Sequence, residues 1–176
     1  LLVDIVCHNL TEISYMASVC EIGSSLGAND RGLYMRVHGF NDKLMKLFAI
    51  MLETLLKFRN NNTNKLPDGF TDQSFHLVVE NYRRACHNSG MKASKLASDV
   101  RIRCICQKGY SGRQRLEELE NIDIATFTTV VSDLLHKIGA EGLHIGNVDV
   151  ATAIVAKDTI LDLLKKSCTG HCGLSR

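Results

Sequence analysis

Apolar side chains recur at steps of three and four residues along most of this chain, and this spacing constrains its fold more than any other feature. Each such segment predicts an amphipathic helix with one face to bury. The periodicity predicts helices over residues 2–20, from 41 or 42 to 58, 71–86, 92–106, 113–119 and 124–138. A further helix, capped by Asp149, is expected to end near Lys166.

Two segments depart from helical spacing and predict strands. Residues 29–32, with the sequence Asn-Asp-Arg-Gly, carry turn chemistry, and residues 33–40 alternate in polarity, so a β-hairpin is expected there. Gly139 ends a helix, and the short Gly-rich apolar run 142–148 predicts another strand. The expected order is therefore α-β-β-α-α-α-α-α-β-α.

This order predicts an α+β fold class, with helices packed on one face of a small, mostly antiparallel sheet. Three strands are few for so many helices, and Leu1 enters helical periodicity without a capping residue before it. We therefore expect a piece of a larger protein, truncated at its N-terminal strands. Residues 1–166 are expected to form a single domain and residues 167–176 a tail or linker.

The composition is that of a soluble globular protein, with 45% hydrophobic and 23% charged residues among 176. A net charge of +2 gives no overall attraction to nucleic acid or to an anionic membrane. The longest apolar stretch, 44–58, contains Lys46, Glu53 and Lys57, whereas a bilayer span needs roughly 20 apolar residues. A membrane is not expected as a partner, nucleic acid is not favoured by the overall charge, and any electrostatic function must be local.

The seven cysteines are odd in number and scattered, and several occupy apolar helix positions. This usage favours reduced core thiols in a cytoplasmic protein over a disulfide framework. The segment Cys168-Thr169-Gly170-His171-Cys172 offers three soft ligands in five residues, but zinc needs a fourth. A tail with free thiols is the expectation there.

No self-contained catalytic site is expected. A helical zinc site needs the pattern H-x-x-E-H or H-E-x-x-H, and neither the segment from His8 to Glu12 nor that from His76 to Glu80 provides it. Each His–Glu pair is expected to form a hydrogen bond on a helix surface instead. The chain also lacks G-x-S-x-G, Walker and G-x-G-x-x-G motifs. We therefore predict no catalytic residue, no metal ligand and no cofactor within this chain.

One strong charge asymmetry stands out. Between residues 83 and 115 there are nine basic residues and the single acidic Asp99, with Tyr110 as the only aromatic residue near its end. A solvated helical face, an anionic protein or peptide partner, and nucleic acid all remain open, although a stacking platform for single strands is missing. The candidate contacts to an anionic partner or a chamber wall are Arg83, Arg84, Lys92, Lys95, Arg101 and Arg103.

Several segments together resemble the pitrilysin family of zinc metallopeptidases, in its insulin-degrading enzyme and nardilysin branch. The most specific are the stretch ending Gly39-Phe40-Asn41-Asp42-Lys43 and the later Glu141-Gly142-Leu143-x-x-Gly146-Asn147. Gly39 and Gly146 are expected at sharp turns. The likeness also includes Leu10-x-Glu12-x-x-Tyr15-x-Ala17, Gly32-Leu33-Tyr34-x-x-Val37, and Phe75 with Glu80, Tyr82 and Arg84.

The resemblance implies a large peptidase of four homologous α+β domains in two halves that close around a peptide chamber, with this stretch as the third, non-catalytic domain. It implies zinc in the first domain of the parent protein, docking against the catalytic N-terminal half, and peptide substrates. An alternative is a binding or scaffold module of a catalytically inactive homologue, and a third hypothesis is an anion-binding module. An intact H-x-x-E-H upstream, with a downstream Glu, would distinguish the first two.

Overall fold

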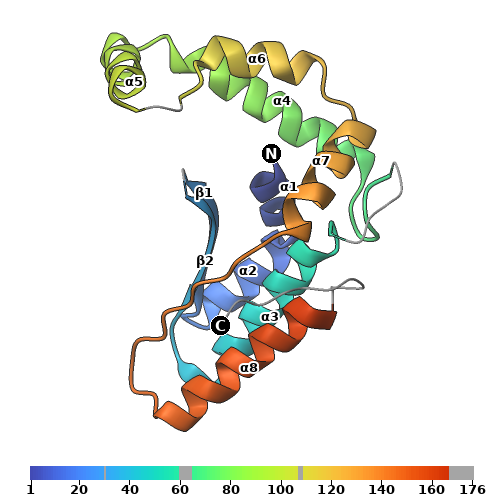
Figure 1. The fold of residues 1–176 in the computed structure, drawn as a ribbon, viewed down its shortest axis with the longest axis vertical. Coiled ribbons are helices and arrows are strands. Elements are labelled where there is room, and N and C mark those ends of the chain that lie inside the picture. Colours follow the sequence, from blue (N-terminus) through green and yellow to red (C-terminus); the bar gives the residue numbers. More distant parts are fainter. Residues whose placement is uncertain (30, 60–64, 107–108, 167–176) are drawn as a thin grey trace.

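The computed structural model describes residues 1–29, 31–59, 65–106 and 109–166, and these are mostly helical (Figure 1). A two-stranded antiparallel sheet, formed by β1 (Gly23–Asn29) and β2 (Gly32–His38), lies beside the first helices. The fold class is therefore α+β, as the sequence predicts. The helices are α1 (Leu2–Asn9), α2 (Thr11–Val19), α3 (Asn41–Leu56), α4 (Asp72–Ser89), α5 (Ala93–Ile105), α6 (Gly112–Glu120), α7 (Ile124–His136) and α8 (Val150–Lys166).

The first helix predicted by the sequence is two short helices. Leu10, with ψ near 2°, separates α1 from α2, although its side chain is buried with Ile5 and Val6. The apolar spacing continues through Leu10, so periodicity alone did not predict the break between the two helices. The second helix ends in a Schellman motif, in which the Ile22 N–H donates to the Ala17 carbonyl and Glu21 adopts a left-handed φ of 57°.

The hairpin has the predicted turn and buries one face. Asn29 pairs with Gly32, and the Asn29 side-chain oxygen accepts from the Arg31 and Gly32 N–H groups at 2.9 and 3.1 Å. Half-buried Leu26, Met35 and Val37 pack towards the core from the covered face. The predicted packing of helices on one face of the sheet is confirmed.

The predicted strand at 142–148 is wrong. The segment forms no strand, and Leu143 and Ile145 are 85% and 82% exposed. An extended segment becomes a strand only when a neighbour satisfies its backbone groups, and no such pairing is present among the described residues. Gly146, with a φ of 144°, turns the chain before Asp149, whose carboxylate accepts from the Thr152 N–H and caps α8 as predicted.

The hydrophobic core lies where α1, α3, α4 and α7 meet, and aromatic rings form its centre. Phe58 is fully buried and contacts Phe70 and Phe127 with ring centroids 4.7 and 6.0 Å apart. Phe75 from α4 joins the same cluster through Phe127, at 5.3 Å. These contacts place α4 and α7 against the end of α3, in the middle of the molecule (Figure 1).

A buried cation joins the ends of two helices to this core. Arg59 is only 2% exposed, and its guanidinium donates to the His136 carbonyl at 3.2 Å and to the Leu164 carbonyl at 3.1 Å. Those oxygens end α7 and lie in the last turn of α8, where unpaired carbonyls and the helix dipole attract positive charge. The Arg59 carbonyl in turn accepts from the buried Ser132 hydroxyl at 2.9 Å.

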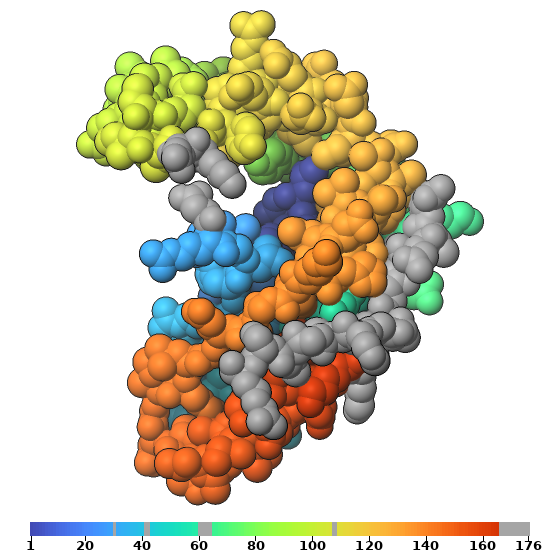
Figure 2. Space-filling model, viewed as in Figure 1, coloured from blue at the N-terminus to red at the C-terminus, as the bar shows by residue number. Residues whose placement is uncertain are grey.

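Helices α4, α5 and α6 form a lobe at one end of the molecule (Figure 2). Helix α6 lies along α4, and α5 projects from the pair (Figure 1). Ser111 and Gln114 form a capping box at the start of α6, as the S-x-x-Q spacing allows. Helix α5 has no buried residue, so its apolar side chains contribute little to the core.

Candidate functional site

The described residues contain no cluster of three or more His, Cys, Asp or Glu side chains that could hold a metal ion. The segment 168–172 lies outside the described residues, so the interpretation of it as a thiol tail stays a prediction. Neither expected His–Glu hydrogen bond forms in the described part of the chain. Glu80 accepts instead from Arg83 and Arg84, at 2.9 and 3.0 Å, and the imidazole of His76 lies edge-on to Phe75.

The structure divides the basic stretch into neutralised and unpaired charges. Arg83 and Arg84 share Glu80, and the Arg84 hydrogen bond is the main reason why the pKa of this carboxyl is lowered. Arg103 pairs with Asp99 at 3.1 Å, with its Nε buried and unbonded. Arg113 pairs with Glu117 at 3.0 Å, whereas Lys92, Lys95, Arg101 and Arg115 form no ion pair within the described residues.

Three of the unpaired cations therefore belong to α5 or its N-cap, namely Lys92, Lys95 and Arg101. The stretch does not converge on one point, because Arg83 and Arg84 lie on α4, Lys95, Arg101 and Arg103 lie on the projecting α5, and Arg113 and Arg115 lie on α6. Of the six predicted contact residues, the structure leaves these three free to meet an anion. Exposed Leu96 and Val100 lie one turn apart on the same helix.

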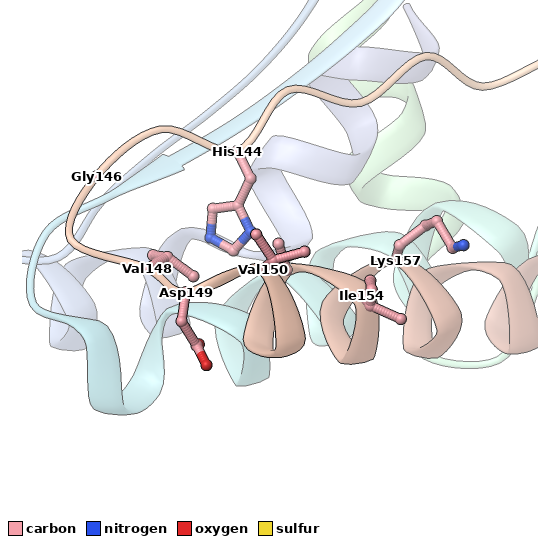
Figure 3. Close-up of a pocket in the computed structure, with 8 residues that line it drawn as sticks. His144, Gly146, Val148, Asp149, Val150, Ile154 and Lys157 are labelled. Carbon is pink, nitrogen blue, oxygen red and sulfur yellow. The ribbon is translucent and has the colours of Figure 1, made fainter.

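A shallow hollow lies between the extended segment before α8 and α8 itself (Figure 3). Its volume is about 410 Å³, and His144, Val150, Ile154 and Lys157 are among its lining residues. The imidazole of His144 points towards α8, whereas the carboxylate of Asp149 points away from the hollow (Figure 3). Asp149 is engaged with Thr152, whose side-chain and backbone hydrogen bonds lower its pKa, so the hollow has no convergent acid–base pair.

An uncovered apolar surface lies on α2. We call Tyr15, Met16 and Val19 the α2 patch, and Tyr15 and Val19 are 70% and 69% exposed. Three- and four-residue steps place these side chains on one helix face. The patch adjoins a groove of about 230 Å³ between α2 and α3, which is lined mainly by apolar side chains and bordered by Lys43 and Lys46. Sequence analysis did not predict this surface. The feature that could have indicated it is the presence of apolar residues, such as Tyr15 and Val19, outside the core-facing positions of the helix.

The five cysteines in the described part of the chain are free, as predicted, but they do not lie in the core, where they were expected. Cys7, Cys20, Cys104 and Cys106 are exposed, and Cys86 is half-buried. Desolvation of the thiol by neighbouring groups, and secondarily the negative charge of Asp4, raise the pKa of Cys7, which disfavours its thiolate. Periodicity placed these cysteines at apolar helix positions, but it did not distinguish exposed positions from buried ones.

No helix among the described residues combines the length and hydropathy needed to cross a membrane. The structure thus presents two apolar or basic surfaces and no assembled catalytic site in its described part. Residues 1–118 match the sequence profile of the family described as the middle or third domain of peptidase M16.

Individual relatives support the same family assignment. Nardilysin of Homo sapiens is 31% identical over 147 residues, covering 83% of this chain and 12% of the relative. A nardilysin-like protein of Arabidopsis thaliana is 24% identical over 164 residues, covering 93% and 15%, respectively. Insulin-degrading enzyme of Homo sapiens is 20% identical over 167 residues, covering 92% and 15%. The chain thus spans about an eighth of nardilysin, and it belongs to the peptidase M16 family, of which it is a middle or third domain.

Proposed function

We propose that this chain is a non-catalytic, chamber-forming domain of a zinc metalloendopeptidase, and that it docks against the catalytic half of the same protein and helps to enclose peptide substrates. The observation that carries the proposal is the extent of uncovered surface. The chain exposes 12939 Å². A compact protein of 19.5 kDa is expected to expose about 8,500 Å².

The surplus is large enough for extensive docking. Stable interfaces between subunits or domains bury on the order of 1,200–2,000 Å² in total, and permanent ones bury more. The α2 patch is the most concentrated apolar part of this surface, and exposed aromatic and Met side chains are typical of interface centres. Because the match spans only 12% of human nardilysin, most of a homologous protein would be available to cover it.

The chemistry of peptide hydrolysis is then supplied elsewhere. The described residues offer no ligand set for zinc, so they do not fit this metal, and no catalytic step is assigned to them. In this proposal the domain acts by confinement: a wall around the reaction space limits the size of the peptide that enters. The five described cysteines, all free, favour a cytoplasmic location.

Substitution of the α2 patch in the full-length protein tests the docking role. Replacing Tyr15, Met16 and Val19 with Ser should leave the bound zinc unchanged, since no ligand is altered, but should loosen enclosure. The rate of hydrolysis of long peptides relative to short ones is then expected to change. Replacing exposed Leu77 with Ser on α4 is a control for the loss of surface apolar groups.

Unchanged size selectivity in the patch variant, together with an unchanged thermal transition, would contradict docking through α2.

The zinc content of the wild-type full-length protein separates the peptidase from an inactive homologue. One zinc per protein together with peptide hydrolysis supports the peptidase. A folded protein that lacks both supports the scaffold alternative.

A further inference from the structure

We infer that the groove between α2 and α3 receives an amphipathic helix from the remainder of the full-length protein, with acidic side chains at one end of that helix and basic side chains at the other. The inference rests on the docking role proposed for the α2 patch, and it specifies the secondary structure and the charge of the segment that docks there. Met16 belongs both to the patch and to the groove, so one helix would cover the two together.

Each wall of the groove is one face of one helix. On both walls the lining residues recur at steps of three and four, which places them on a single helix face. These residues are Ile13, Met16, Ala17 and Cys20 on α2, and Lys43, Lys46, Leu47 and Ile50 on α3. A third helix packs against two such faces by the same spacing of its own side chains. The groove has a volume of about 230 Å³. A cavity of about 150 Å³ already holds a benzene ring, so a large apolar side chain fits the groove.

The two walls run in opposite directions (Figure 1). The β1–β2 hairpin connects them, and a methyl group at Gly39, just before α3, would lie 2.5 Å from the carbonyl oxygen of Glu21, just after α2. The end of α2 therefore lies beside the start of α3. Cys20 and Lys43 share one end of the groove, and the opposite end is formed by the earlier part of α2 and the later part of α3.

The groove is positive at one end and negative at the other. Lys43 and Lys46 are exposed at the first end, and neither forms an ion pair within the described residues. Glu12 and Glu53 lie next to the apolar lining at the other end, and they too are exposed and without an ion pair in the described part of the chain. A helix with acidic side chains at one end and basic side chains at the other complements both. Helices favour this distribution, because acidic residues stabilise the first turn and basic residues the last.

Other occupants fit the groove less well. A face that binds an anionic membrane surrounds its apolar residues with cations, whereas Glu12 and Glu53 would repel the lipid headgroups. An added strand needs a free sheet edge to pair with its backbone, and no strand residue lines the groove in the part of the chain that the structure describes. A helix pairs its own backbone groups, so it needs only an apolar face and matching charges.

Two labelled helical peptides test the inference on this chain. Both carry Leu at three- and four-residue steps; one has Glu in its first turn and Lys in its last, and the other has Gln at all these positions. Fluorescence anisotropy should show that the charged peptide binds about fivefold more tightly than the Gln peptide at low salt. This preference should fade as the salt concentration rises. Equal affinity for the two peptides would overturn the inference.

Reversal of the two lysine charges identifies the site. Lys43→Glu with Lys46→Glu should abolish the preference for the charged peptide, whereas the matched control Lys92→Glu with Lys95→Glu on α5 changes the net charge equally and should preserve it. Loss of the preference in the control alone would move the site to α5. Dimerisation of the chain in analytical ultracentrifugation, abolished by the Lys43 and Lys46 substitutions, would assign the groove to a second copy instead.

Alkylation of Cys20 by iodoacetamide tests occupancy in the full-length protein, because this thiol is exposed and lines the groove. Its rate, measured by mass spectrometry, should be several-fold lower in the full-length protein than in this chain alone. Lys43→Glu with Lys46→Glu should restore the rate, whereas the rate at exposed Cys104 on α5 should be the same in the wild-type and variant full-length proteins. Protection of Cys20 that the variant retains would overturn the charge-matched helix but leave the docking role intact. Equal rates at Cys20 in the full-length protein and in the chain alone would contradict both.

Discussion

Replacing Arg59 with alanine removes the buried guanidinium group that joins the ends of α7 and α8 to the core. The guanidinium donates to the His136 and Leu164 carbonyls, at 3.2 and 3.1 Å, and is 2% exposed. Alanine leaves both carbonyls without this donor and opens a void beside Phe58. The expected consequence is a less stable chain in which α8 loosens first.

The size of the effect follows from these contacts. Hydrogen bonds from a charged donor contribute about 1.5–3 kcal/mol each, and favourable charge–dipole contacts at helix ends add about 0.3–1 kcal/mol. Burying a charge costs desolvation free energy, and no carboxylate pairs with Arg59 among the described residues to offset that cost. Removing the charge recovers this cost and so reduces the net loss of stability. The net loss should be about 3 kcal/mol, a large part of the 5–15 kcal/mol typical of a domain.

Urea unfolding of the chain measures this loss. With a slope of about 2 kcal/mol/M, the midpoint of Arg59→Ala should fall by about 1.5 M. Arg59→Lys keeps the charge but not the two-pronged geometry, and should fall about half as far. Arg113→Ala is the control, because Arg113 is 89% exposed and its pair with Glu117 contributes less than about 1 kcal/mol. A midpoint for Arg59→Ala no lower than that of Arg113→Ala would refute the reasoning.

Three further predictions concern backbone conformation and helix caps, and each is checked by urea unfolding. Gly39→Ala should destabilise the chain by about 2 kcal/mol, because Gly39 has a φ of 137° and a methyl group there would lie 2.5 Å from the Glu21 carbonyl oxygen; an unchanged midpoint would contradict this. Glu21→Gly should stabilise it by about 0.5–1 kcal/mol, because a left-handed C′ position favours glycine; a lower midpoint would count against it. Hydrogen bonds to their carboxylates lower the pKa values of the helix caps Asp123 and Asp149 in the folded chain, so the stability they add is present above the unfolded pKa of about 3.9 and is lost as pH falls through the lower folded values. Replacing both residues with Asn should reduce the loss of folding stability as the pH falls. The same loss in the variant and in the unmodified chain would contradict this prediction.

Local patterns predicted the helices and the hairpin because both arise from neighbouring residues. Apolar spacing defines a helix face, and Asn29 with Gly32 defines the turn, so neither depends on distant parts of the chain. The cap at Asp149 was predicted for the same reason. The break at Leu10 was not, because the apolar stripe continues through it.

Features that depend on distant residues could not be predicted in this way. The segment 142–148 has the composition of a strand, but only a pairing partner would make it one. The role of Arg59 depends on helix ends that lie 77 and 105 residues further along the chain. Charge counting located the basic stretch, yet only the structure shows that Glu80 occupies Arg83 and Arg84 while Lys92, Lys95 and Arg101 stay unpaired.

Hydroxyl-radical footprinting of Tyr15 and Met16 tests the docking role most directly. The reaction rate of each side chain would be compared between this chain alone and the full-length protein that carries it. Both side chains are exposed in the chain alone, so they should react readily there. If the domain docks through α2, both should be protected several-fold in the full-length protein. Equal rates in the two forms would show that the patch stays uncovered and would contradict the account.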